Sequence, residues 1–180
     1  MDVVEDIDIL GDEALRTRVA TWSAVSLAAT LALVAVPLAA GVGEGLSLRW
    51  AVLLGVVSLA ALPVHELVHA LAAKALGPAG TKVSFGYQTG MLYTRMEGLV
   101  LPRARMTAVL LAPSVLVSTA LLAVPWVLGA PCLGLALCGV HLSGCTGDIA
   151  MVAEISRHPE ATHVRDTDCG IQLLAEPVRP

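Results

Sequence analysis

Long apolar runs constrain this chain more than any other feature, because about 20 apolar residues suffice to cross the hydrocarbon core of a bilayer. Four such runs occur, at residues 21–42, 50–76, 106–128 and 132–155. The chain is 56% apolar and 14% charged, which exceeds what a soluble domain of this length can bury. We therefore expect a multi-pass integral membrane protein with about four transmembrane helices, in which Pro113 and Pro125 kink or end the third.

Residues 80–98, between the second and third runs, have a different character. Val83, Phe85 and Tyr87 alternate with polar residues up to the turn sequence 88–90, and an apolar stretch follows. Alternation around a glycine-containing turn is typical of a β-hairpin. The aromatic side chains either serve a functional site or simply anchor the hairpin at the membrane interface. The expected fold class is thus an all-α polytopic membrane protein with one small β-hairpin between helices two and three.

The distribution of Lys and Arg predicts the orientation of the spans, since these residues concentrate in cytoplasmic loops. Most of them lie near the end of the second run, between it and the third, or outside the first and last runs, at Arg16, Arg18, Lys74, Lys82, Arg95, Arg103, Arg105, Arg157, Arg165 and Arg179. Both termini and the hairpin should therefore be cytoplasmic. The expected organisation is a cytoplasmic N-terminal segment (1–20), a membrane-embedded domain (21–157) and a cytoplasmic C-terminal tail (158–180). Residues 164–171 of this tail read as a strand and turn.

The second run contains the sequence His65-Glu66-Leu67-Val68-His69. Two histidines four residues apart lie on the same face of a helix, so both imidazoles can reach one metal ion while the glutamate stands beside it. Ionisable groups inside a bilayer are costly and usually functional. The pattern therefore favours a zinc site over two histidines that merely pack in a core.

Asp148 is the expected third ligand. In the predicted topology His69 and Asp148 each lie seven residues before the cytoplasmic end of an inward-running span, about 10 Å from it at 1.5 Å per residue. A His₂ pair needs a third ligand and leaves one position for water. His141 and Cys145 precede Asp148 with helical spacing, so all three should share one face of span four. Either could replace or join Asp148, although both are better read as neighbours of the ligands or as packing residues.

Four features occur together, namely the His65-Glu66-x-x-His69 sequence in one span, the cytoplasmic hairpin, Ala112-Pro113 in the next span and Gly147-Asp148 in the last. In these features the chain resembles the membrane zincins related to the site-2 intramembrane metalloproteases. The resemblance covers about residues 50–170 and marks 21–157 as a zincin-like domain. It implies that His65, His69 and Asp148 bind Zn²⁺, that Glu66 is the general base, and that peptide bonds within or beside the bilayer are cleaved. Since the chain has no Asn, His141 is the best candidate to stabilise an oxyanion.

The expected function is accordingly membrane-embedded zinc proteolysis, with a membrane protein or peptide as substrate and the lipid bilayer as partner. A catalytically silent metal-binding protein that binds or scaffolds membrane partners is the alternative, but it has no need of Glu66. A transporter would show repeated halves with broken helices, and no such repeat is evident. The sequence pI of about 5.7 argues against nucleic acid, which attracts a basic face.

Overall fold

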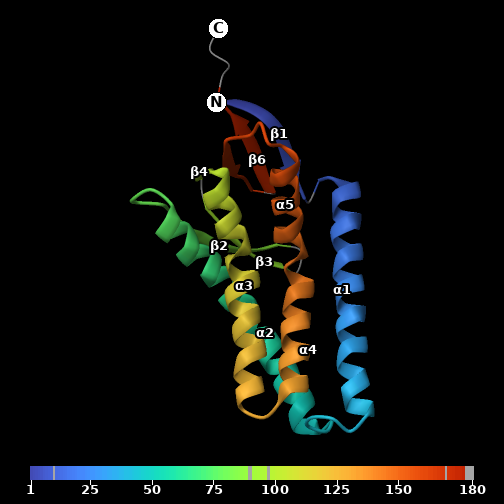
Figure 1. The fold of residues 1–180 in the computed structure, drawn as a ribbon. Coiled ribbons are helices and arrows are strands. Elements are labelled where there is room, and N and C mark those ends of the chain that lie inside the picture. The colour runs from blue at the N-terminus through green and yellow to red at the C-terminus, as the bar shows by residue number, and fades with distance from the viewer. Residues whose placement is uncertain (10, 89–90, 97, 169, 177–180) are drawn as a thin grey trace. The chain divides into compact units, whose positions relative to one another are not determined.

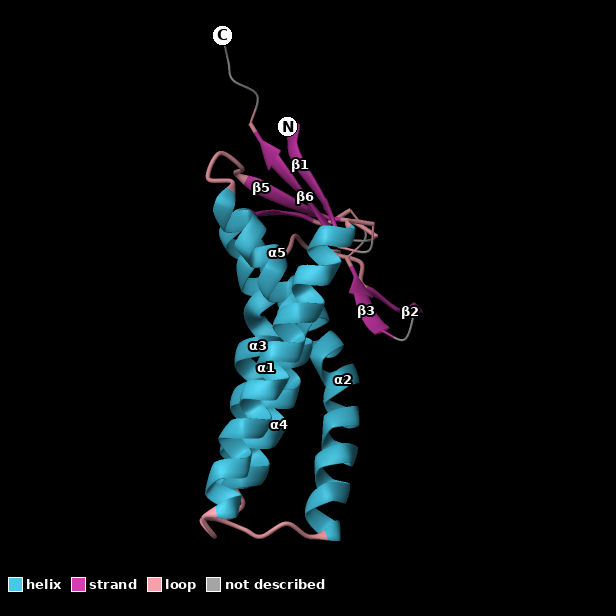
Figure 2. Cartoon of the chain, turned by 90° about the vertical axis from the view of Figure 1, so that its right-hand side faces the viewer, coloured by secondary structure: helices cyan, strands magenta, loops and turns pink. Residues whose placement is uncertain are grey.

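A computed structural model describes residues 1–9, 11–88, 91–96, 98–168 and 170–176. Within these residues five helices form: α1 (Glu13–Ala39), α2 (Leu48–Leu76), α3 (Arg103–Val127), α4 (Pro131–Gly144) and α5 (Thr146–Arg157). The strands are β1 (Asp2–Asp8), β2 (Ser84–Gln88), β3 (Met91–Arg95), β4 (Val100–Pro102), β5 (His163–Asp166) and β6 (Gly170–Ala175). Figure 1 labels these elements except β5, which is labelled in Figure 2.

The chain divides into two compact units, which we describe separately. Unit 1 comprises Met1–Val19, Glu66–Ala112 and Gly147–Pro180. Unit 2 comprises Ala20–His65 and Pro113–Thr146. All the strands belong to unit 1, whereas unit 2 is helical throughout its described elements.

Unit 1 contains two antiparallel sheets. The larger has the strand order β1-β6-β5-β4, and β1, β6 and β5 lie side by side as arrows in Figure 2. The smaller is the hairpin of β2 and β3, which confirms the antiparallel hairpin predicted between the second and third long helices. Residues 89–90 of its predicted turn lie outside the described residues.

The all-α prediction is wrong in the N-terminal segment and incomplete in the tail. The segment 1–20 contains β1, which pairs with β6 although the two strands lie near opposite ends of the sequence. The strand and turn expected at 164–171 correspond to parts of β5 and β6, with residue 169 outside the described part of the chain. An acidic strand such as β1 carries little β-propensity of its own, so its partner rather than its sequence decides the structure.

The core of unit 1 lies where the larger sheet meets its helices. Ile155 of α5 packs with Val164, Ile171 and Leu173 of the strands, and all four are essentially buried. Met106 and Val109 of α3 belong to the same cluster and are also fully buried. This packing holds the short helix α5, and with it Asp148, in place within unit 1.

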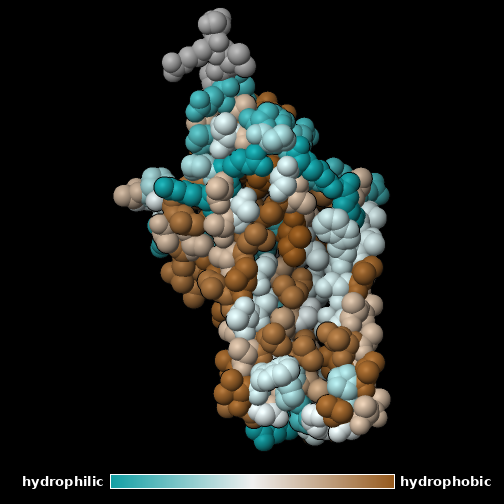
Figure 3. All heavy atoms as spheres, viewed as in Figure 1, coloured by the Kyte–Doolittle hydropathy of each residue, from teal (hydrophilic) through white to brown (hydrophobic). Residues whose placement is uncertain are grey.

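The long helices expose apolar side chains along their lengths. Val56, Leu59 and Leu62 of α2 are each more than half exposed, and apolar residues, brown in Figure 3, cover much of the visible helical surface. Helices α1, α2 and α3 are long and apolar enough to cross a membrane, and α4 with α5 would make a fourth span if the pair counts as one. Apolar faces of this extent are typical of surfaces that bind a membrane or a protein partner.

The fourth predicted span, 132–155, is not one continuous helix. α4 ends at Gly144, the N–H of Cys145 bonds to the carbonyl oxygens of His141 and Leu142, and α5 begins at Thr146. The Thr146 hydroxyl donates to the Ser143 carbonyl, a local bond that competes with helical hydrogen bonding. Gly144 weakens the helix at the same point. His141, Cys145 and Asp148 therefore do not share one helix face, contrary to the prediction.

A carboxylate from the loop between α1 and α2 caps α4 within unit 2. The side chain of Glu44 accepts hydrogen bonds from the backbone N–H groups of Cys132 and Leu133, in the first turn of α4, and from Trp50 Nε1. Burial raises the pKa of Glu44, but the hydrogen bonds from its own backbone, Leu133, Cys132 and Trp50 outweigh burial and bring the pKa below its ordinary value. The ionised form of Glu44 is thus stabilised by folding.

We predict that Glu44→Ala lowers the free energy of unfolding at neutral pH by about 1 kcal/mol, as loss of a helix cap typically does. A lowered pKa means that the contribution is complete above the unfolded-state value and disappears as the pH falls through the folded-state value. The difference between wild type and variant should therefore shrink in acid. Denaturant unfolding in detergent measures it, with the exposed Glu5→Ala as control; equal stabilities at neutral pH would refute the cap.

Candidate metal centre

The His65-Glu66-x-x-His69 sequence lies within the continuous helix α2. His65 and His69 are one turn apart, so their side chains leave α2 on the same face, as the sequence predicts. His65 and Glu66 are half-buried and His69 is buried. Glu66 and His69 belong to unit 1, and His65 is the last residue of the first segment of unit 2.

His69 is oriented by a backbone carbonyl group. Its Nδ1 atom lies 3.0 Å from the carbonyl oxygen of Val109 in α3. Because a carbonyl oxygen only accepts hydrogen bonds, Nδ1 carries the hydrogen, and Nε2 of the neutral ring carries the lone pair. Metal-binding histidines in proteins are usually held in this way, by a bond from the ring nitrogen that does not bind the metal.

The Nε2 atom of His69 faces Asp148 of α5 at 3.5 Å from Oδ1. Two donors bound to one tetrahedral zinc ion through bonds of 2.0–2.2 Å lie about 3.4 Å apart. The observed separation therefore suits a cation between the imidazole and the carboxylate, and both side chains are largely shielded from solvent. The structure thus brings together, within unit 1, two of the three residues expected to bind metal.

Glu66 is held by a residue that the sequence did not single out. The hydroxyl group of Thr94 in β3 lies 2.7 Å from Glu66 Oε2 and 2.9 Å from the Glu66 carbonyl oxygen. These contacts fix the carboxylate of α2 to the hairpin within unit 1. The alternation in 80–98 predicted the strand, but nothing in it could indicate that this threonine meets Glu66.

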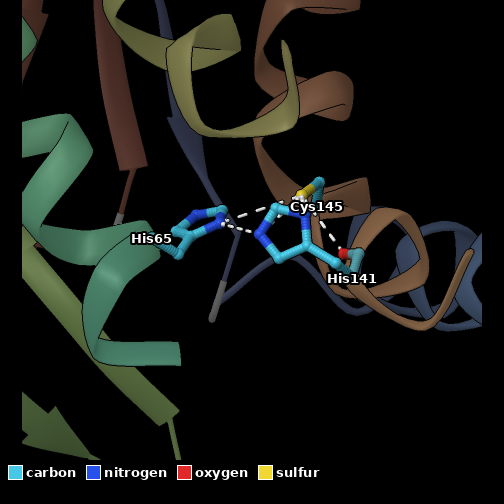
Figure 4. A group of neighbouring side chains, drawn as sticks. All are labelled: His65, His141 and Cys145. Atoms are coloured by element: carbon cyan, nitrogen blue, oxygen red, sulfur yellow. Dashed lines mark hydrogen bonds between the residues drawn. The ribbon is translucent and has the colours of Figure 1, made fainter. Parts of the chain in front are cut away.

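A second group of donor atoms lies in unit 2 and consists of His65, His141 and Cys145. His65 Nδ1 is 3.2 Å from His141 Nε2, and Cys145 Sγ is 3.8 Å from His65 Nδ1. Figure 4 shows the three side chains turned toward one another. The other nitrogen of His141, Nδ1, is 2.9 Å from the hydroxyl oxygen of Ser118 in α3, another residue that the sequence analysis missed.

The aspartates of the C-terminal tail have structural partners in unit 1. Asp166 accepts a hydrogen bond from the backbone N–H of Met96 at 2.8 Å, and Asp168 pairs with Arg95 at 2.8 Å. Burial raises the pKa of Asp166 to about 7, against the lowering effect of its bond from Met96. These carboxylates attach the tail to the segment that follows β3, whereas Asp148 contacts His69.

Comparison with known proteins identifies a family for this chain. Residues 58–163 match the model of a family described as “Putative zincin peptidase”. The matched range includes His65, Glu66, His69, His141, Cys145 and Asp148. No curated protein and no solved structure matches the chain. Because the family match covers more than half of its residues, the chain belongs to this zincin peptidase family, and zinc is the metal that the family implies.

Thr94 provides a test of the geometry around Glu66 that does not depend on activity. Thr94→Val keeps the shape of the side chain but removes the hydroxyl donor, so a partly buried carboxylate loses its partner. We expect the free energy of unfolding to fall by about 1–3 kcal/mol, measured by denaturant unfolding in detergent. Thr94→Ser retains the hydroxyl and should stay close to wild type. If Thr94→Val were as stable as Thr94→Ser, the contact with Glu66 would be refuted.

Proposed function

We propose that this zincin peptidase is a membrane-embedded zinc metalloprotease that hydrolyses peptide bonds of membrane proteins within or next to the bilayer. The observation that carries the proposal is the set of contacts around α2. A long apolar helix holds His69, whose Nε2 is directed at Asp148, and Glu66, whose carboxylate is held by Thr94. Ionisable groups in an apolar helix are energetically costly, and they are typical of a functional site.

His65, His69 and Asp148 are the residues that we propose to hold the zinc ion. Two imidazoles and a carboxylate match the donor types of catalytic zinc sites, which keep a fourth position open. His69 supports this role most directly, because its ring is oriented by Val109 and faces Asp148. His65 is included in the proposed ligand set because it lies one turn before His69 on α2. When bound, zinc supplies a Lewis acid that polarises the scissile carbonyl group and acidifies water.

Glu66 is the proposed general base. Its carboxylate takes a proton from the attacking water and passes it to the amine that leaves when the C–N bond breaks. The hydrogen bond from Thr94 to Oε2 orients the group, and a carboxylate oxygen can still accept a proton while it accepts that bond. Thr94 is thus a positioning residue, which acts on the reaction through Glu66.

The length and apolar surface of the helices support the proposed membrane location. α1, α2 and α3 each have the length and hydropathy of a span, and α2 exposes Leu59, Leu67 and Leu71 around the same turns that carry the histidines. A site on such a helix meets substrates that are themselves in or beside the bilayer. The excess of Lys and Arg around 74–105 and outside the first and last runs supports cytoplasmic termini. The proposed relation to the site-2 proteases rests on the His65-Glu66-x-x-His69 sequence.

The hairpin is the proposed contact for the substrate. A peptide bond in a membrane helix is protected by its hydrogen bonds, so it must be unwound before attack. β2 and β3 pair with each other, and Phe85 and Tyr87 of β2 are 58% and 71% exposed. Because β2 and β3 form a two-stranded sheet, each strand has an outer edge, and an extended segment of substrate can add to this edge through backbone hydrogen bonds. Since Thr94 of β3 also holds Glu66, this edge is tied directly to the base.

We predict that Glu66→Gln abolishes proteolysis and leaves zinc bound. Glutamine keeps the size of the side chain and can still accept a bond from Thr94, but it cannot take the proton, and a general base contributes typically 10²–10⁴-fold. The measurement is cleavage of a single-span membrane substrate in vesicles, with zinc content determined on the same samples. Equal cleavage by the two proteins, both zinc-loaded, would remove the protease assignment and favour a silent membrane metal-binding protein.

The ligand set is tested by metal content in a Cys145→Ser background, which removes the sulfur donor of the group in unit 2. In that background His65→Ala, His69→Ala and Asp148→Ala should each lose most of the zinc at equilibrium with a weak chelator, because a ligand is missing. Asp168→Ala is the matched control, since Asp168 pairs with Arg95 and is largely exposed. If Asp168→Ala lost zinc and Asp148→Ala retained it, the proposed set would be wrong.

A further inference from the structure

We propose that His65, His141 and Cys145 form a second metal-binding position, in unit 2, with a soft nitrogen–nitrogen–sulfur donor set. The donor atoms are His65 Nδ1, His141 Nε2 and Cys145 Sγ. Neither His69 nor Asp148 belongs to the group, whereas His65 is common to both sets. Because a neutral imidazole has one lone pair, His65 binds an ion in only one of the two positions at a time. Thiolate and imidazole ligands together select soft or borderline cations such as Cu(I), Zn²⁺ and Cd²⁺ over hard cations, which prefer oxygen.

The distances between the donor atoms fit one ion. The separations are 3.2 Å between the two nitrogens, 3.8 Å from sulfur to His65 Nδ1 and 3.9 Å from sulfur to His141 Nε2. On a tetrahedral ion with metal–nitrogen bonds of about 2.0 Å and a metal–sulfur bond of about 2.3 Å, the corresponding separations are about 3.3 and 3.5 Å. Each pair thus needs to move by no more than a few tenths of an ångström.

The two imidazole rings converge through their edges. Their centroids lie 5.3 Å apart with an interplanar angle of 58°, so the rings are not stacked. A tilted pair with nitrogen atoms at closest approach suits two ligands of one ion better than ring packing does. In the metal-free chain the same nitrogens can share a single proton.

Ser118 prepares His141 for this role. Nδ1 of His141 is the ring nitrogen closer to Cys145, at 3.6 Å, but it is also 2.9 Å from the Ser118 hydroxyl. When Nδ1–H donates to that oxygen, Nε2 carries the lone pair and is the atom available to a metal. Outer partners of this kind are what orient ligating histidines in known metal sites.

Two of the three donors, and the serine beside them, are shielded from water. Cys145 is fully buried, and His141 and Ser118 are less than a tenth exposed. The Cys145 thiol rests 3.2 Å from the His141 carbonyl oxygen, to which it donates. On binding a cation the thiol gives up this proton to solvent and the sulfur forms the bond to the metal, so one proton is released for each ion bound.

Cadmium binding to the purified full chain in detergent tests the proposal, because a cadmium–thiolate bond gives a near-ultraviolet charge-transfer band. Wild type should develop the band up to one equivalent of Cd²⁺. Cys145→Ser should abolish it, and Ser118→Ala should weaken binding about 10–100-fold. Cys138→Ser is the matched control, since this half-buried cysteine lies in α4, the helix that ends just before Cys145, and it should keep the band.

His69→Ala separates this site from the proposed catalytic one. It removes a ligand of the catalytic set and should leave the cadmium band intact, whatever the outcome of the proteolysis assay. Circular dichroism confirms that each variant is folded. A band that persists in Cys145→Ser, or that disappears in Cys138→Ser alone, would overturn the second metal position, as would a wild type that shows no band with excess Cd²⁺.

Discussion

The hydrogen bond between His69 Nδ1 and the Val109 carbonyl oxygen is the interaction on which the candidate site depends. A neutral imidazole presents one lone pair, and this bond decides that the lone pair is on Nε2, where Asp148 stands. Val109 is itself fully buried in the core of unit 1, so the acceptor cannot move away. The packing of α3 against the sheet thus fixes the orientation of the His69 ring through a single backbone carbonyl group.

Three further polar contacts orient groups in the same way. Glu66 is held by Thr94, His141 by Ser118, and the first turn of α4 by Glu44. Where water is excluded, an unsatisfied polar group is costly, and a network in which members have partners is rigid as well as stable. Rigidity is what a metal site requires, because ligands must keep their separations when the ion is absent.

Several of these features were accessible from the sequence. Hydropathy located the long helices, the alternation in 80–98 predicted β2 and β3, and the spacing of His65 and His69 predicted a shared helix face. Each of these signals is local, extending over a few residues or turns. A strand and turn in the tail were also predicted, since residues 164–171 have a strand-like sequence.

The remaining features depend on contacts between distant segments. β1 is acidic and becomes a strand because β6 pairs with it. The break at Cys145 depends on Gly144 and on a side-chain bond from Thr146, which a count of apolar residues cannot register. Thr94 and Ser118 are unremarkable in the sequence and gain their roles only because the fold places Glu66 and His141 beside them.

The most direct test of the zinc site on α2 is X-ray absorption at the zinc edge, on Cys145→Ser protein loaded with one equivalent of zinc. A site formed by His65, His69 and Asp148 should give a first shell of two imidazole nitrogens together with oxygen donors at about 2.0–2.2 Å, and should lose one imidazole when His69→Ala is added. A first shell that lacks imidazole, or one that His69→Ala leaves unchanged, would contradict the claim that α2 carries a zinc site.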